Sequence, residues 1–292
     1  MPAITAHHQT LPSGRVLWAE TYGHGPPGSP AILFANGMAS TTNAWNSLVH
    51  TFPEALLANH TVVLHDAANT GKSPHQANLP APSLASLATE ARQLLQHLGF
   101  SSGYFVGHSF GAQQGYVAAA LDPGFWQGLL LLAPQTDRVT PRTAKFMKAM
   151  MDIYDKDPET AAYAEEVRYT PGTRMVAKNG IYGAFAREMA LRQRSEGLAL
   201  AFKALLEPKE GDFAWKDMKT RIVIVHGGED ELAPVSEGEY ALRMLRAVEG
   251  ADAELLVLPE SGHWMNWENE EWTRDQVLKL VGFSREGVWI EE

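Results

Sequence analysis

Short, nearly continuous apolar runs recur along this chain and alternate with stretches whose apolar residues follow the period of a helix. The runs occupy residues 31–35, 61–65, 104–108, 129–133, 222–226 and 255–258, and a partly alternating run precedes them at residues 16–21. Runs without polar interruptions are typical of strands covered on both faces, as in a parallel sheet between two layers of helices. The alternation therefore predicts an α/β fold with a mostly parallel central sheet flanked by helices.

Several of the intervening stretches carry helix start or stop signals. Ser83 can cap a helix with one apolar stripe over residues 84–98, and Gly99 can end it. Further helices are expected at residues 109–121, 237–248 and 270–281, each after a predicted strand. Strands that alternate with helices in this way predict successive βαβ units.

The alternation breaks between residues 135 and 219, where no strand is apparent. Helical patterns there cover residues 143–154, 158–168, 182–194 and 196–206. A connection of about 80 residues is much longer than the usual loops of an α/β domain. We therefore expect a helical cap, inserted after the sixth strand, at residues 135–219. The core domain would then consist of residues 1–134 and 220–292.

Composition narrows the range of partners. The chain has 292 residues and a formal net charge of −10, which disfavours binding to nucleic acid or to anionic membranes. No apolar run reaches the ~20 residues needed to cross a bilayer, and residues 1–14 show no secretory signal. We expect a cytoplasmic protein that acts on a small-molecule substrate, and nothing in the sequence excludes a homodimer.

Cofactor and metal signals are weak. The chain has no cysteine, which excludes disulfides, thiolate catalysis and thiolate metal ligands. No His-Glu-x-x-His motif occurs, and the pair His7 and His8 is interpreted as part of a flexible N-terminus. We expect neither a metal nor a cofactor.

The sequence Gly107-His108-Ser109-Phe110-Gly111 joins a predicted strand to a predicted helix. This is the G-x-S-x-G pattern in the strand–turn–helix setting that its chemistry requires. Small residues on both sides leave room for a strained serine, whose hydroxyl then projects from the carboxyl edge of the sheet. Ser109 is therefore the candidate nucleophile.

A serine nucleophile needs a base and an acid from other loops at the same edge of the sheet. His263 follows the strand at residues 255–258, and Asp230 follows the strand at residues 222–226. We predict His263 as the general base and Asp230 as the acid that orients it. The other candidate acids are Glu229, Glu231 and, after the strand at residues 129–133, Asp137, which is the main rival.

Backbone amides at the same edge can stabilise an oxyanion. The loop after the strand at residues 31–35 begins Asn36-Gly37-Met38, and we predict the amides of Met38 and Phe110 as the two donors. The side chain of Asn36 can brace this loop. The residues expected to lie against the substrate are Asn36, Gly37, His108 and Trp264.

With these motifs the chain resembles the α/β-hydrolase superfamily, in its branch of lidded esterases, lactonases and C–C hydrolases. The resemblance extends from Val16 to Val281 and implies the α/β-hydrolase fold. Two loops depart from the usual pattern. The oxyanion loop usually begins His-Gly, whereas here it begins Asn36-Gly37. The next loop usually follows D-x-R-G-x-G-x-S, whereas residues 66–73 lack the arginine and the first glycine.

Together, these features predict a serine hydrolase that forms an acyl-enzyme. Ser109 would attack a carbonyl while His263 accepts its proton. The leading substrate class is an ester or lactone of a small, mainly apolar molecule. Hydrolysis of a carbon–carbon bond beside a ketone is one alternative. A receptor of the same fold, which binds a small molecule without turnover, is the other.

Overall fold

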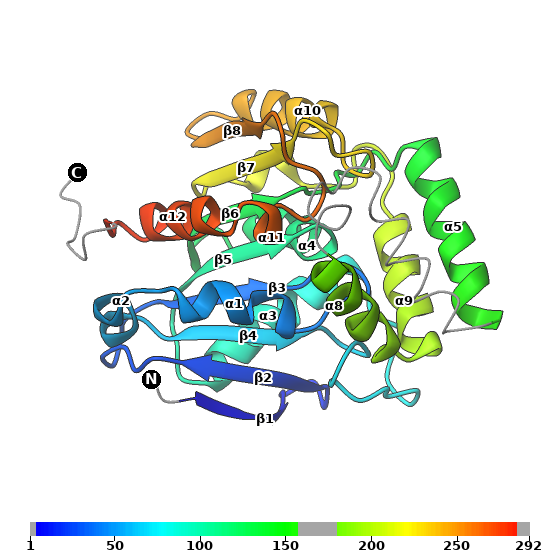
Figure 1. The fold of residues 1–292 in the computed structure, drawn as a ribbon. Coiled ribbons are helices and arrows are strands. Elements are labelled where there is room, and N and C mark those ends of the chain that lie inside the picture. The colour runs from blue at the N-terminus through cyan, green and yellow to red at the C-terminus, as the bar shows by residue number, and fades with distance from the viewer. Residues whose placement is uncertain (1–3, 157–179, 285–292) are drawn as a thin grey trace.

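The computed structural model describes residues 4–156 and 180–284 and has a twisted sheet of eight strands at its centre (Figure 1). The strands are β1 (Ile4–Thr10), β2 (Val16–Tyr22), β3 (Ala31–Ala35), β4 (Val62–Asp66), β5 (Gly103–His108), β6 (Trp126–Leu132), β7 (Ile222–Gly227) and β8 (Ala253–Leu258). Their order is β1-β2-β4-β3-β5-β6-β7-β8, in which β2 pairs antiparallel with β1 and β4 and all other pairs are parallel. The predicted fold class is confirmed.

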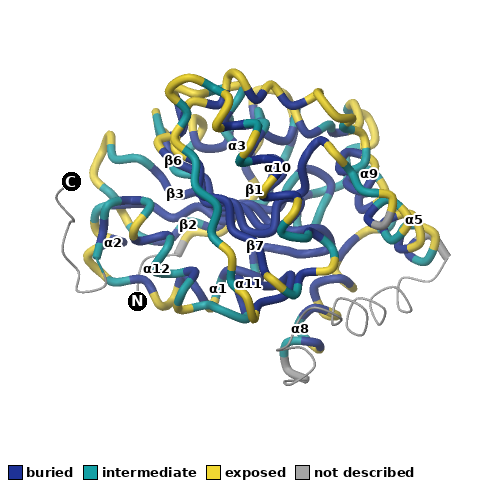
Figure 2. Tube along the Cα trace, turned by 90° about the horizontal axis from the view of Figure 1, so that it is seen from above, coloured by how far each residue is buried: buried dark blue, intermediate teal, exposed yellow. Residues whose placement is uncertain are grey.

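The apolar runs form strands because side chains from both faces enter a core. On β3, Leu33 packs into one apolar cluster and its neighbours Ile32 and Phe34 pack into another, as the alternation of a strand requires. Figure 2 shows the buried strands in the middle of the molecule, with helices on both sides. The two clusters therefore cover opposite faces of the sheet, and the carboxyl ends of its parallel strands face one edge.

Helices cover both faces of the sheet. On one side lie α3 (Leu84–His97), α4 (Phe110–Leu121) and α10 (Val235–Arg246), and on the other lie α1 (Asn43–His50), α2 (Glu54–Asn59), α11 (Met265–Glu268) and α12 (Glu270–Leu280). Ser83 caps α3 as predicted, because its hydroxyl accepts from the amide of Ser86 while the Ser86 hydroxyl accepts from the amide of Ser83.

The connection from β6 to β7 is helical, as expected for a cap. It contains α5 (Pro141–Lys156), α8 (Gly180–Leu191), α9 (Ser195–Leu206) and the short 3₁₀ helix η1 (Trp215–Asp217). Figure 1 shows α5, α8 and α9 beyond the carboxyl ends of the strands. The helix predicted at residues 158–168 lies outside the described residues, and the domain boundaries at 134 and 219 stay a prediction.

The first strand differs from the sequence-based interpretation. His7 and His8 are not part of a flexible segment, because both lie in β1 and pair with Ala19 and Trp18 of β2. Strand β1 is an exposed edge of the sheet, so polar side chains occupy it and weaken its apolar signal. Helices α1 and α2 were not predicted either. Among the described residues, no helix is both long and apolar enough to cross a membrane.

Candidate active site

Ser109 lies in the tight turn between β5 and α4. Its φ of 51° and ψ of −115° are strained for a residue with a side chain, and its amide donates to the carbonyl of Leu132 over 2.8 Å. The neighbouring glycines make this turn possible. A Cβ on Gly107 would lie 2.7 Å from the backbone of Ala112, and one on Gly111 would lie 2.3 Å from the carbonyl oxygen of Ala35.

The structure brings the three predicted catalytic side chains together in series. His263, in the loop between β8 and α11, has its Nε2 3.0 Å from Ser109 Oγ. On the other side of the ring, its Nδ1 is 2.8 Å from Oδ2 of Asp230, in the loop between β7 and α10. All three residues are buried. With Nδ1–H donating to the carboxylate, Nε2 is the ring atom that accepts from the serine hydroxyl.

Asp230 is held in a defined orientation. Its Oδ1 accepts from the amides of Leu232 and Ala233 over 2.8 and 2.9 Å, which leaves Oδ2 for His263. Burial by itself raises the pKa of Asp230. The charge and hydrogen bond of His263 and the amide of Ala233 outweigh it and hold the pKa below its ordinary value. The carboxylate is therefore ionised at neutral pH.

The rival acids differ from Asp230 in burial or in hydrogen-bond partners. Glu229 is half-buried and Glu231 is exposed, whereas the Asp230 carboxylate between them points inward to His263. Asp137 has a different set of partners. Its Oδ2 accepts from the amides of Gly211 and Phe213 and from Nε1 of Trp215, so this carboxylate ties the start of the cap to its end.

His108 and Trp264 are both buried against the His263 loop. The ring centroid of His108 lies 5.0 Å from that of His263 and 4.9 Å from that of Trp264, and its Nε2–H donates to the His263 carbonyl over 2.8 Å. Burial lowers the pKa of His108 to about 3, so the ring is neutral. Both side chains thus contact the loop that carries His263, and their contact with a substrate stays a prediction.

Glu268 supports the same loop and was not predicted from the sequence. Its carboxylate accepts from the amides of Gly262 and Trp264, over 2.8 and 3.2 Å, and so holds the backbone on both sides of His263. Burial raises the pKa of Glu268 above its ordinary value. The hydrogen bonds from the two amides reduce this rise but do not cancel it. Its position at the end of the four-residue helix α11 offers no sequence signal for this role.

The predicted oxyanion loop, residues 36–42, lies beside Ser109. A Cβ on Gly37 would be 3.4 Å from Cβ of Ser109 and 2.8 Å from Nδ1 of His108. Within the described part of the chain, the amides of Met38 and Phe110 have no hydrogen-bond acceptor. The backbone amides of Met38 and Phe110 are therefore available to donate to a developing oxyanion, and this role stays a prediction.

Asn36 and Asp66 hold this loop in place. Asn36 does brace the loop, as predicted, because its Nδ2 donates to the carbonyl of His65 and to Oδ1 of Asp66, over 2.9 and 3.0 Å. The same Oδ1 accepts from the amide of Thr42 over 2.7 Å, and Oδ2 accepts from the amide of Lys72 over 2.8 Å. Burial raises the pKa of Asp66 to about 7 although these amides lower it. Asp66 therefore connects both ends of the oxyanion loop, a role that the sequence did not indicate.

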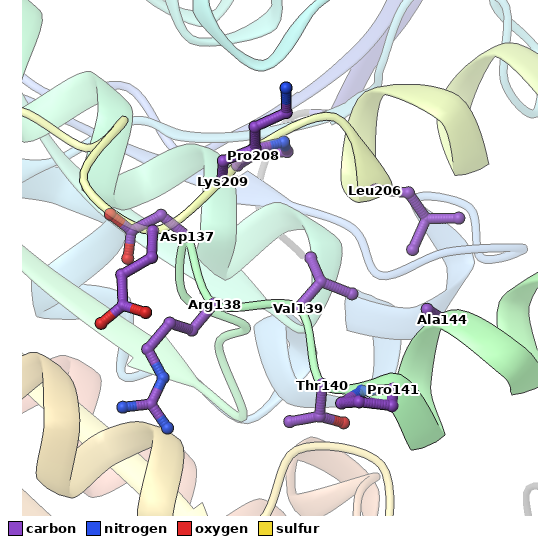
Figure 3. A pocket seen from close by; sticks show the side chains of 10 residues that line it. Asp137, Arg138, Val139, Thr140, Pro141, Ala144, Leu206, Pro208 and Lys209 are labelled. Carbon is purple, nitrogen blue, oxygen red and sulfur yellow. The ribbon is translucent and has the colours of Figure 1, made fainter.

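A cavity of about 530 Å³ lies where the cap joins the core (Figure 3). It is lined by residues 137–141 and 208–210 together with Ala144 and Leu206. This lining contains none of the three residues Ser109, Asp230 and His263, so the cavity is not the site of their chemistry. Among the described residues, no group of three or more His, Asp or Glu side chains could hold a metal ion.

A mostly parallel sheet with a Ser–His–Asp series and two amide donors at its carboxyl edge is typical of hydrolases of the α/β class. Comparison with known families agrees with this class. A family model described as the alpha/beta hydrolase family matches residues 32–276, and the chain belongs to this family.

Individual relatives are distant. The chain is 27% identical over 275 residues to the dihydrolipoyllysine-residue acetyltransferase component of the acetoin cleaving system of Pseudomonas putida, over 92% of this chain and 67% of that protein. It is 25% identical over 242 residues to RutD of Pseudomonas savastanoi pv. phaseolicola, named as a candidate carbamate hydrolase, over 82% of this chain and 88% of that one. The enol-lactonase from Burkholderia xenovorans LB400 superposes with a TM-score of 0.78 at 17% identity, over 94% of this chain and 99% of that one.

Proposed function

We propose that this hydrolase cleaves an ester or lactone of a small, mainly apolar substrate through an acyl-enzyme on Ser109. The observation that carries the proposal is the unbroken series from Ser109 Oγ to His263 Nε2, at 3.0 Å, and from His263 Nδ1 to Asp230, at 2.8 Å. Such a series activates a serine that would otherwise be a weak nucleophile.

The first half of the reaction is acylation. Ser109 Oγ attacks the substrate carbonyl carbon as its proton passes to Nε2 of His263, and the ionised Asp230 stabilises the imidazolium that forms. The amides of Met38 and Phe110 donate to the oxygen that becomes negative. His263 then donates the proton to the departing alkoxide, and the acyl group stays on Ser109.

The second half is hydrolysis of the acyl-enzyme. His263 is neutral again and accepts a proton from a water molecule, whose oxygen attacks the acyl carbon. The same two amides stabilise the second oxyanion. When it collapses, the bond to Ser109 breaks, His263 returns the proton to Ser109 Oγ, and the carboxylic acid leaves.

The apolar character of the substrate is inferred from the cap side of the site. Aromatic side chains of α8 lie against the core beside the His263 loop, where Tyr182 stacks on Trp267 at 6.0 Å and Phe185 contacts it at 5.5 Å. The net charge of −10 also disfavours anionic substrates at long range. We therefore expect uncharged acyl groups to be preferred.

The proposal is tested by labelling and turnover of the wild-type protein and of Ser109→Ala. A fluorophosphonate should add one phosphonyl group to Ser109, located by peptide mass spectrometry, and a p-nitrophenyl ester of a short fatty acid should be turned over many times. Ser109→Ala should lose the label and at least about 10³-fold in kcat/KM.

A substrate panel then separates the reaction classes. It contains p-nitrophenyl esters, γ- and δ-lactones, an aryl carbamate and a vinylogous diketone. Faster cleavage of the diketone than of every ester and lactone would favour the C–C hydrolase. An unlabelled Ser109 in a protein that binds an apolar ligand tightly without turnover would favour the receptor and contradict the proposal.

A further inference from the structure

We infer that Gln193, in the cap between α8 and α9, is a positioning residue for the oxyanion loop of residues 36–42. Its side-chain amide donates a hydrogen bond to Ser40 in the middle of this loop, whereas the Asp66 carboxylate holds the two ends of the loop. The inference rests on the proposed function and adds a residue from the cap to its machinery.

The oxyanion loop needs such support because its conformation is strained. Ala39, next to the proposed donor Met38, has a φ of 56°, in the left-handed region that is unfavourable for a residue with a side chain. A weak hydrogen bond of 3.3 Å from the amide of Ser40 to the carbonyl of Gly37 closes the turn. Asp66 restrains the loop only at Asn36 and Thr42, so residues 38–40 need a restraint of their own.

Gln193 supplies it. Its Nε2 donates to the carbonyl of Ser40 over 3.2 Å, and also to the carbonyl of Met189 over 3.3 Å within its own segment. Its Oε1 accepts from the amide of Gly71, in the loop after β4, over 3.0 Å. One buried amide group thus joins the cap to two loops of the core. Since both amide atoms are used, the orientation of this side chain is fixed.

Neighbouring contacts keep this corner of the cap on the core. The Ser40 hydroxyl lies 3.8 Å from Sδ of Met189, which belongs to α8. At the start of α9, a Cβ on Gly197 would be 1.8 Å from the carbonyl oxygen of Asn69, so the helix backbone packs directly on the loop after β4. The corner is therefore close enough to the core for Gln193 to act on Ser40.

The consequence is a coupling between the cap and transition-state stabilisation. If the bond to Ser40 is lost, the loop can relax at Ala39, and the Met38 amide moves away from the oxyanion. Oxyanion donors act mainly in the transition state, so kcat should fall while KM changes little.

Two variants of Gln193 and one control test this inference. Gln193→Met keeps the length and loses both hydrogen-bonding atoms. Gln193→Glu keeps an acceptor for the Gly71 amide but places a carboxylate against the Ser40 carbonyl. The control is Arg192→Ala, since Arg192 is exposed on the same turn and its guanidinium pairs with Glu188 of α8. For each protein we would measure kcat and KM on the best ester, the Ki of an aryl boronic acid, and the melting temperature.

Both Gln193 variants should lose about 10-fold in kcat, less than the loss from deleting a whole oxyanion donor, with KM within about threefold. The Ki of the boronate, whose tetrahedral adduct places an oxygen between the two amides, should rise by the same factor. Arg192→Ala should match the wild type.

A merely structural role would lower the melting temperature and leave kcat of the folded protein and the Ki of the boronate unchanged, and that result would overturn the inference. Failure of the proposed function has a different signature. In that case the wild type itself would neither hydrolyse the ester panel nor take a phosphonyl label on Ser109, and the role of Gln193 would be rejected with it.

Discussion

Backbone strain in the described part of this protein lies at the carboxyl edge of the sheet. The non-glycine residues with positive φ are Ala39, Asn69, Ser109 and Ala133. They follow β3, β4, β5 and β6 respectively, which are four neighbouring strands of the sheet. Strained residues persist only where the surrounding contacts hold them, and they concentrate at functional sites. The pattern marks the same edge as the Ser109, His263 and Asp230 contacts.

The sharpest prediction at the residue scale concerns Asp230→Asn. The asparagine can still accept from the amides of Leu232 and Ala233 but cannot stabilise an imidazolium, so kcat should fall by about 10³- to 10⁴-fold. KM and the circular dichroism spectrum should change little. Because the pKa of Asp230 lies below the ordinary value of 3.8 for an aspartate, the wild-type carboxylate stays ionised as the pH falls from 8 to 5. Loss of activity over this range therefore does not come from Asp230. Wild-type-like turnover by Asp230→Asn would reject Asp230 as the acid.

At the scale of elements, the close approach of α4 to the sheet positions Ser109, the proposed nucleophile. Gly111 lies in the first turn of α4, against the Ala35 carbonyl at the end of β3. Gly107, at the end of β5, makes a similarly close contact with the backbone of Ala112. The nearest atoms that a Cβ at Gly111 or Gly107 would meet belong to the backbone of Ala35 and Ala112. They cannot move aside without displacing β3 or α4.

We therefore expect Gly111→Ala to lower the free energy of unfolding by about 2 kcal/mol or more and to abolish ester turnover. The added methyl would push α4 away from β3 and displace Ser109. Gly124→Ala is the matched control, because it is an exposed glycine whose Cβ would have no atom within 4 Å. Urea denaturation followed by tryptophan fluorescence measures the free energy of unfolding of both variants. Equal stability of the two variants would contradict this account of the turn.

At the scale of the whole molecule, the chain crosses from the core into the cap and back at one place. Asp137, just after β6, accepts from the amides of Gly211 and Phe213, just before β7. The cavity in Figure 3 lies at this junction. One carboxylate thus joins the entry and exit of the cap. The homodimer left open by the sequence stays a prediction at this scale.

Asp137→Ala should lower the free energy of unfolding by about 2 to 4 kcal/mol, because it leaves the amides of Gly211 and the buried Phe213, and the indole N–H of the buried Trp215, without their acceptor. In the folded protein kcat should stay within about threefold of the wild type, since Asp137 does not contact His263. Thermal unfolding and ester kinetics, measured on the same preparation, check both expectations. A loss of kcat as large as that of Asp230→Asn, without loss of stability, would instead make Asp137 the catalytic acid.

The amino-acid sequence by itself determined the features that depend on local pattern. Uninterrupted apolar runs predicted the parallel strands, Ser83 predicted the start of α3, and the glycines around Ser109 predicted the tight turn after β5. These signals are local because strand burial, helix capping and turn sterics depend on residues close together in the chain. The edge strand β1 was missed because exposure removes the apolar pattern on which such predictions depend.

Only the tertiary structure decided which distant groups meet. Asp230 and Asp137 both follow strands at the correct edge, and the packed loops alone show that Asp230 reaches His263. The same holds for Asp66, Glu268 and Gln193, whose partners are backbone amides and carbonyls that are present at almost every residue. A hydrogen bond to a backbone group leaves no pattern in the sequence. It exists only because the strand order and the packing of the cap bring the two segments together.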